Sequence, residues 1–135
     1  KYSPVGELGR VSAEYAEAIT RTSGIPIAIC DRDSVVAVAG VPRKEYAEKH
    51  ISAELEAVIE SRGLYVYRAG EPKFSPIVDG GSHYITCAMP IISEGDVLGC
   101  VAALCADGAS RAENGSVEAK LVQTAAAFLA KQLES

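Results

Sequence analysis

Two segments, one near each end of the chain, carry apolar residues at intervals of three and four positions. The first runs from Ser3-Pro4 to Ser23-Gly24, and the second covers residues 117–134. Their apolar positions are Leu8, Val11, Tyr15, Ala18 and Ile19 in the first, and Val117, Leu121, Val122, Ala125, Phe128, Leu129 and Leu133 in the second. This spacing places apolar side chains on one face of a helix, so the pattern predicts amphipathic helices at both ends.

The segments between these helices favour strands. Short apolar or alternating runs occur at 25–30, 35–39, 64–68, 83–92 and 97–106. A further helix is predicted over 53–62, because Ser52 is a good N-cap and Gly63 a natural stop. Residues 69–82 form the longest irregular segment.

The predicted order is helix, two strands, helix, three strands, helix. Strands that follow one another through hairpin turns pair antiparallel, so we expect an α/β (α+β) fold with a central antiparallel sheet of about five strands. The terminal helices would pack on one face, and segments 42–63 and 69–82 would cover the other as a helix-loop roof. That covered face is either a filled core or a small-molecule cavity. On strand 83–92 the alternation assigns one face to Ile85, Cys87, Met89 and Ile91, and the other to Tyr84, Thr86 and Ala88.

Composition limits the classes of function. The chain has 135 residues, a formal charge of -5 and a pI of about 5.0, which suits one domain and argues against a phosphate-tracking surface. No apolar run is long enough to cross a membrane, and the first residues lack a signal segment. We therefore expect a cytoplasmic location. The chain begins at Lys1 and its only methionine is Met89, so we expect it to be a domain of a longer protein.

Few residue patterns suggest chemistry. Asp31 and Asp33 flank Arg32 between two predicted strands; they form a turn, a turn that contacts a ligand, or a carboxylate pair, and the turn alone explains each residue. Ser82-His83 lacks the flanking glycine pattern of a nucleophile elbow. We predict no catalytic residues.

The four cysteines lie within apolar runs at positions 30, 87, 100 and 105. They are interpreted as small buried hydrophobic residues rather than zinc ligands, and no metal site is predicted. A redox-active cysteine remains an alternative, and it would need an exposed thiol of low pKa. His50 lies just before Ser52, where it either belongs to a simple cap or adjoins an anion at the helix start.

Four segments together resemble a known family: KYSPVGELG at the start, ICDRDSVVAVAG, KEYAEKHIS and the final TAAAFLAKQLE. In this order they are similar to the C-terminal GAF domains of the stage V sporulation protein T family, which regulate transcription in spore-forming Firmicutes. The resemblance covers essentially the whole chain, 1–135. It implies a GAF fold, terminal helices that pair between subunits, and a preceding AbrB-type DNA-binding domain that this chain lacks.

GAF domains commonly bind small molecules between the sheet and the roof. The resemblance therefore implies a regulatory domain that senses a ligand and oligomerises. The identity of this ligand, the effector, is unknown. Such an effector would favour one arrangement of the terminal helices and so set the spacing of the DNA-binding domains. The residues predicted to adjoin the ligand are Tyr46, His50, Ser52, Cys87 and Met89. The alternative is a purely structural homodimerisation module with a filled core and no effector.

Overall fold

A computed structural model describes residues 4–106, 108 and 115–133. Its helices are α1 (Pro4–Ser23), α2 (Arg43–Tyr46), α3 (Ala53–Ser61) and α4 (Gly115–Gln132). Its strands are β1 (Ile27–Asp31), β2 (Val35–Ala39), β3 (Tyr65–Val66), β4 (His83–Ser93) and β5 (Asp96–Ala106). The elements follow the predicted order, with two differences: the short helix α2 was not predicted, and the third strand is shorter than expected.

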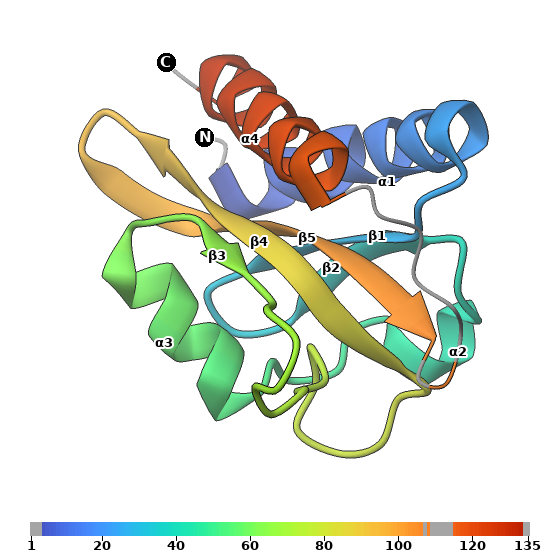
Figure 1. The fold of residues 1–135 in the computed structure, drawn as a ribbon. Coiled ribbons are helices and arrows are strands. Elements are labelled where there is room, and N and C mark those ends of the chain that lie inside the picture. Colours follow the sequence, from blue (N-terminus) through green and yellow to red (C-terminus); the bar gives the residue numbers. More distant parts are fainter. Residues whose placement is uncertain (1–3, 107, 109–114, 134–135) are drawn as a thin grey trace.

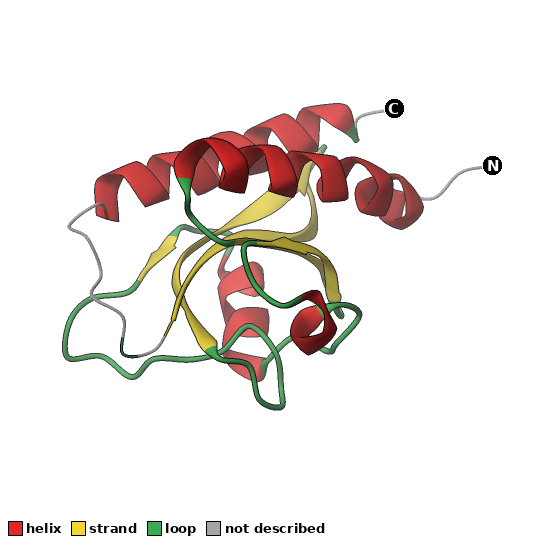
Figure 2. Cartoon of the chain, turned by 90° about the vertical axis from the view of Figure 1, so that its right-hand side faces the viewer, coloured by secondary structure: helices red, strands yellow, loops and turns green. Residues whose placement is uncertain are grey.

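The five strands form one antiparallel sheet in the order β2-β1-β5-β4-β3. The predicted fold class is thus confirmed. Helices α1 and α4 lie side by side on one face of the sheet, and α2, α3 and the long β3–β4 connection lie on the other (Figures 1 and 2). We use "roof" for α2, α3 and residues 67–82. Within the described residues, no helix has both the length and the apolar character needed to cross a membrane.

Each face of the sheet has its own apolar core. Under α1 and α4 the buried side chains include Ile27, Ile29, Val122 and Leu129. Under the roof the buried set comprises Ala28, Cys30, Val35, Tyr46, Ile51, Leu55, Ile59, Ile77, Ile85, Ala88, Val97, Cys100, Ala102 and Leu104. The apolar runs at 27–30 and 100–104 therefore serve both cores, because successive strand residues point to opposite faces.

The connection between β1 and β2 is a tight turn. Oδ1 of Asp31 accepts hydrogen bonds from the backbone N–H groups of Asp33 (2.7 Å) and Ser34 (2.8 Å). This is the backbone-capping role that aspartate commonly takes at the start of a turn. The turn interpretation of Asp31 is confirmed, and one oxygen of its carboxylate accepts from two backbone donors.

A β-bulge changes which residues of β4 face which core. Ile85 pairs with Leu104 and Cys87 pairs with Ala103, so Thr86 is an extra residue in β4. One extra residue reverses the facing of everything beyond it. Ile85 and Ala88 consequently belong to the roof core, whereas Cys87 and Ile91 belong to the core under α1 and α4. The predicted common face for Ile85, Cys87, Met89 and Ile91 is wrong for this reason.

Candidate functional site

Within the roof, Ser52 joins α3 to the β3–β4 connection. Its hydroxyl caps α3 by accepting from the N–H of Leu55 (3.2 Å) and donates to the carbonyl of Ser75 (2.8 Å). The backbone N–H of Ser52 also donates to the carbonyl of Pro76 (3.0 Å). A residue predicted as a ligand neighbour is therefore buried and already fully engaged in holding two roof segments together.

Tyr46 fills the other end of the roof. Its side chain is fully buried, and its Oη accepts a hydrogen bond from the backbone N–H of His83 (2.9 Å). Gly81 lies against it: a Cβ at that position would be 3.0 Å from Tyr46 Oη and 2.8 Å from Ser75 Oγ. The backbone of Gly81 also has a φ of 90°, which glycine adopts without strain. Gly81 therefore makes room for the tyrosine ring.

A short hydrogen-bond chain lies beside Tyr46. Oε1 of Glu45 accepts from the hydroxyl (2.9 Å) and the backbone N–H (3.3 Å) of Ser82. The same hydroxyl lies 2.9 Å from Nδ1 of His83. Because the serine donates its one proton to Glu45, Nδ1 of His83 is the donor to Ser82 Oγ. This order, with serine between carboxylate and imidazole, differs from a catalytic triad, in which the histidine lies in the middle.

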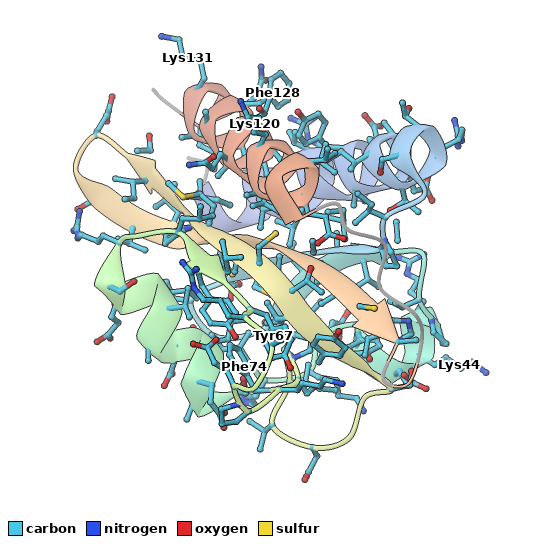
Figure 3. All side chains as sticks on the ribbon, in the orientation of Figure 1. Lys44, Tyr67, Phe74, Lys120, Phe128 and Lys131 are labelled. Carbon is cyan, nitrogen blue, oxygen red and sulfur yellow. The ribbon has the colours of Figure 1, made fainter. Side chains whose placement is uncertain are left out.

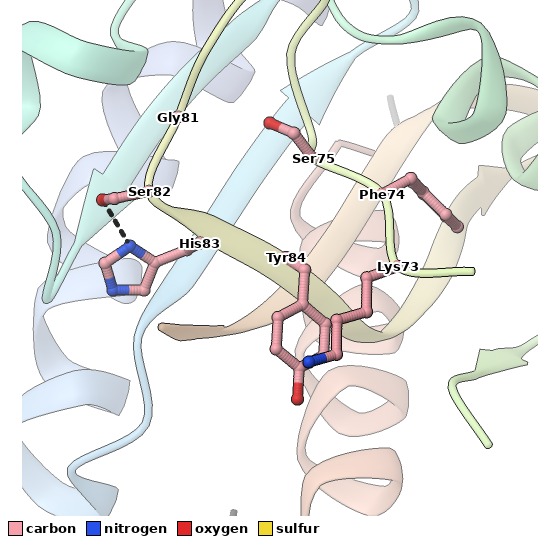
Figure 4. Close-up of a pocket in the computed structure, with 7 residues that line it drawn as sticks. All are labelled: Lys73, Phe74, Ser75, Gly81, Ser82, His83 and Tyr84. Carbon is pink, nitrogen blue, oxygen red and sulfur yellow. Dashed lines mark hydrogen bonds between the residues drawn. The ribbon is translucent and has the colours of Figure 1, made fainter. Parts of the chain in front are cut away.

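A small cleft opens next to this chain, between residues 73–75 and 81–84 (Figure 4). Its volume is about 160 Å³. Ser82 and His83 lie on one side of the first residues of β4, whereas Lys73 and Tyr84 lie on the other, with Lys73 Nζ 4.6 Å from the centre of the Tyr84 ring. The charged and polar groups therefore diverge, and the cleft is open to solvent rather than a closed binding site.

The five predicted ligand neighbours do not surround one space. Tyr46 and Ser52 are buried under the roof, and His50 is exposed at its rim, with Nδ1 3.3 Å from the carbonyl of Asp33. Cys87 and Met89 pack against the core of α1 and α4, on the opposite face of the sheet. The prediction of one pocket lined by all five residues is therefore wrong, because the bulge at Thr86 turns Cys87 and Met89 to the other face of the sheet.

Sequence reasoning missed three residues that the structure brings together with Tyr46: Glu45, Gly81 and Ser82. The glycine pair at 80–81 was the available signal, since two glycines before a strand often mark a close approach of the backbone. Nothing local indicates Glu45, because its partner lies 37 residues further along the chain.

Two of the four cysteines, Cys30 and Cys100, lie in a structural environment, whereas Cys105 is partly exposed. Cys30 and Cys100 pair across β1 and β5 and are fully buried under the roof. A hydrogen bond with Cys100, together with burial, raises the pKa of the Cys30 thiol well above its usual value. Since the thiolate is the reactive form, this pair lacks the environment of a redox-active cysteine. In the described parts of the chain, no three His, Cys, Asp or Glu side chains gather in a way that could hold a metal ion.

The terminal helices carry a stacked aromatic pair in which Tyr15 is half-buried and Phe128 is exposed. The rings of Tyr15 and Phe128 stack with centres 4.6 Å apart, and Phe128 lies on the outside of α4 (Figure 3). Phe128 is 41% exposed and Val117 is 56% exposed. A groove of about 330 Å³ between α1 and α4 is lined by Val11, Glu14, Tyr15, Ala18, Phe128 and Gln132.

Solved structures share this fold at low sequence identity. The type II free methionine-R-sulfoxide reductase from Thermoplasma acidophilum matches with a TM-score of 0.63 and 8% identity, covering 97% of this chain and 95% of that chain. The cofactor-binding GAF domain of the nutrient sensor CodY from Clostridium difficile matches with a TM-score of 0.55 and 15% identity, covering 98% and 99%. At such identities the likeness establishes the GAF fold alone.

Sequence comparison goes further. Stage V sporulation protein T from Bacillus subtilis (strain 168) is 38% identical over 136 residues, which cover 99% of this chain and 73% of that protein. The model of the family described as "Stage V sporulation protein T C-terminal, transcription factor" matches residues 7–134. The chain therefore belongs to the stage V sporulation protein T C-terminal family, as a GAF-type regulatory domain of a sporulation transcription factor.

Proposed function

We propose that this domain senses a small effector and forms a homodimer, and that the two events together control a transcription factor in the cytoplasm. The observation that carries the proposal is membership of a transcription-factor family with a GAF fold. DNA would be contacted by a separate domain placed before residue 1 in a longer protein. The acidic charge of -5 suits a domain that makes no phosphate contacts itself.

The dimer interface would be the outer side of α1 and α4. Large exposed apolar side chains gathered on one surface commonly mark protein–protein contacts, and aromatic residues are enriched at the centres of such contacts. Phe128 supplies the exposed apolar side chain, and its stack with the half-buried Tyr15 beside the groove supplies the aromatic contact. A two-fold interface would bring the same patch from each subunit together.

The effector would enter at the cleft beside Tyr46. The roof core beyond it has a floor of small side chains, namely Ala28, Cys30, Ala88, Cys100 and Ala102. Of the originally predicted neighbours, Tyr46 and Ser52 lie on this side, and His50 lies at its rim. The nutrient sensor CodY offers a parallel, because its GAF domain is named as cofactor-binding. In this chain, binding would shift the population of terminal-helix arrangements.

Native mass spectrometry on protein purified from its own host cells tests both parts of the proposal. We expect a dimer that carries a reproducible additional mass in the range of a small molecule. Phe128→Ala should weaken the dimer, while the exposed α3 substitution Glu56→Ala should leave it unchanged. A strict monomer at micromolar concentration would contradict the dimer.

A purely structural dimerisation module is the second candidate. The observation in its favour is the packed roof core, in which the large side chains of Tyr46, Leu55, Ile59 and Ile85 are almost fully buried. A dimer without added mass, and without a thermal shift from a panel of metabolites, would favour this candidate over effector sensing.

A further inference from the structure

Residues 41–47, which contain α2, are bounded by two residues with left-handed backbone conformation. Gly40 has a φ of 84° and Glu48 a φ of 65°. Positive φ is strained for a residue with a side chain, so Glu48 holds this conformation only while its surroundings impose it. We call residues 41–47 the flap. Tyr46, its last residue but one, has a fully buried side chain.

The backbone hydrogen bonds that form within the flap are local. The N–H of Glu45 donates to the carbonyl of Pro42 (3.1 Å), and the N–H of Ala47 donates to the carbonyl of Arg43 (2.9 Å). In the described part of the chain, the hydrogen bonds that join the flap to the start of β4 use side chains. They are the contacts of Tyr46 Oη with His83 and of Glu45 Oε1 with Ser82.

The rest of the roof is joined by backbone hydrogen bonds to its neighbours. The N–H of Ile51 donates to the carbonyl of Asp33, and the N–H of Val78 donates to the carbonyl of His50, each at 3.0 Å. The capped α3 is tied to Ser75 and Pro76 through Ser52. Opening of the flap would break the hydrogen bonds of Glu45 and Tyr46 with the start of β4, the backbone bonds next to Glu48, and the packing of Val41 and Tyr46 on the roof core. It would leave the backbone bonds of Ile51 and Val78 and the Ser52 contacts in place.

We propose that residues 41–47 form a gate that opens as a unit about Gly40 and Glu48, withdrawing Tyr46 and joining the cleft at residues 73–84 to the roof core. This inference rests on the proposed function in one respect: the gate regulates entry to the effector site. The motion itself occurs without ligand and is tested without ligand. If the gate proposal fails, the proposed dimer and effector binding at another site are unaffected.

Hydrogen exchange of single backbone amides, followed by NMR on the free protein, measures this motion. The N–H of His83 is a direct reporter because its acceptor is Tyr46 Oη. The N–H groups of Ile51 and Ile85 are reference amides, since their acceptors are the carbonyls of Asp33 and Phe74, outside the flap. We expect His83 to exchange through a more frequent opening than either reference amide.

A substitution at Glu45, which does not accept from the reporter amide itself, then tests whether the flap opens as a unit. Glu45→Ala removes the contacts with Ser82 and leaves the acceptor of His83 in place. Exchange at His83 should rise about fivefold, the change that corresponds to one net hydrogen bond. Exchange at Ile51 and Ile85 should stay within experimental error. Glu56→Ala, at an exposed position of α3, is the matched control and should change none of the three.

Two results would overturn the gate. One is a wild-type exchange rate at His83 that reports the same opening equilibrium as Ile51 and Ile85. The other is a Glu45→Ala variant in which His83 does not respond, or in which all three amides accelerate equally because the whole domain is destabilised. The wild-type measurement requires no variant, so the proposal remains testable even if a substitution impairs folding.

Discussion

Gly99 in β5 provides a sensitive test of the sheet, because it lies directly opposite Asp31 of β1. It is buried, and a Cβ at this position would overlap the carbonyl oxygen of Cys30 and come within 2.8 Å of the Cα of Asp31. Both obstacles are backbone atoms in the middle of a sheet, so they cannot move aside as a flexible side chain would. Gly99→Ala must therefore separate β1 from β5 locally or distort one of them.

The expected cost follows from this geometry. Forcing an additional methyl group into a well-packed interior costs about 1–3 kcal/mol, and an overlap with backbone belongs at the upper end, about 3 kcal/mol or more. Gly9→Ala is the matched control, because Gly9 lies inside α1 and its new Cβ would meet Val36 Cγ1 at an ordinary 3.5 Å. Alanine in a helix interior is favoured over glycine by about 0.5–1 kcal/mol. The same substitution should thus have opposite signs at the two positions.

Urea unfolding followed by circular dichroism measures both changes as shifts of the midpoint at constant m-value. We expect Gly99→Ala to lower the midpoint strongly and Gly9→Ala to raise it slightly. A Gly99→Ala protein that unfolds within about 0.5 kcal/mol of wild type, the range of ordinary surface substitutions, would refute the close pairing of β1 with β5.

Three further predictions use the same unfolding assay. Ser12 Oγ is buried and has no hydrogen-bond partner among the residues that the structure describes, so Ser12→Ala should be neutral or stabilising by up to about 1 kcal/mol; a loss above that value would show a partner. Ser52→Ala should cost about 1–3 kcal/mol, because it removes the cap of α3 and the bond to Ser75; a cost below about 0.5 kcal/mol, the range of ordinary surface substitutions, would contradict that role. The raised pKa of Cys30 favours the neutral thiol in the folded state, so its contribution is complete below the usual thiol value of 9.0 and is lost as pH rises above it. Cys30→Ala should flatten this alkaline decline, and an unchanged slope would contradict the assignment.

The sequence was sufficient to predict the element order and the fold class. Apolar periodicity in 4–23 and 115–132 and the short apolar runs around 27–39 are local signals of helices and buried strands. The Asp31 turn was also predictable, since the capping acceptor and its two donors lie within three residues. Helix α2 was not, because four residues bounded by Pro42 and Ala47 carry too little periodicity to reveal a helix.

The candidate site was harder to predict because its contacts are non-local. The bonds from Glu45 and Tyr46 reach residues 37 positions away, and no spacing within either segment encodes that approach. The facing of Cys87 and Met89 depended on strict alternation along β4, which the extra residue Thr86 interrupts. Thr86 is fully buried and its hydroxyl donates to the carbonyl of Ala103 (3.2 Å), so the bulge retains its hydrogen bonding despite the break in register.

The same bulge connects the two halves of the domain. Because β4 shifts its register at Thr86, neighbouring residues of one strand serve different cores: Ile85 and Ala88 face the roof, while Cys87 and Ile91 face α1 and α4. Close-packed interiors transmit small displacements because they contain few voids. Ile85 and Cys87, on either side of Thr86, thus bring the core beneath the proposed gate into direct contact along β4 with the core against which Tyr15 packs. A displacement of Ile85 would reach the side chains that support α4 through this one buried residue.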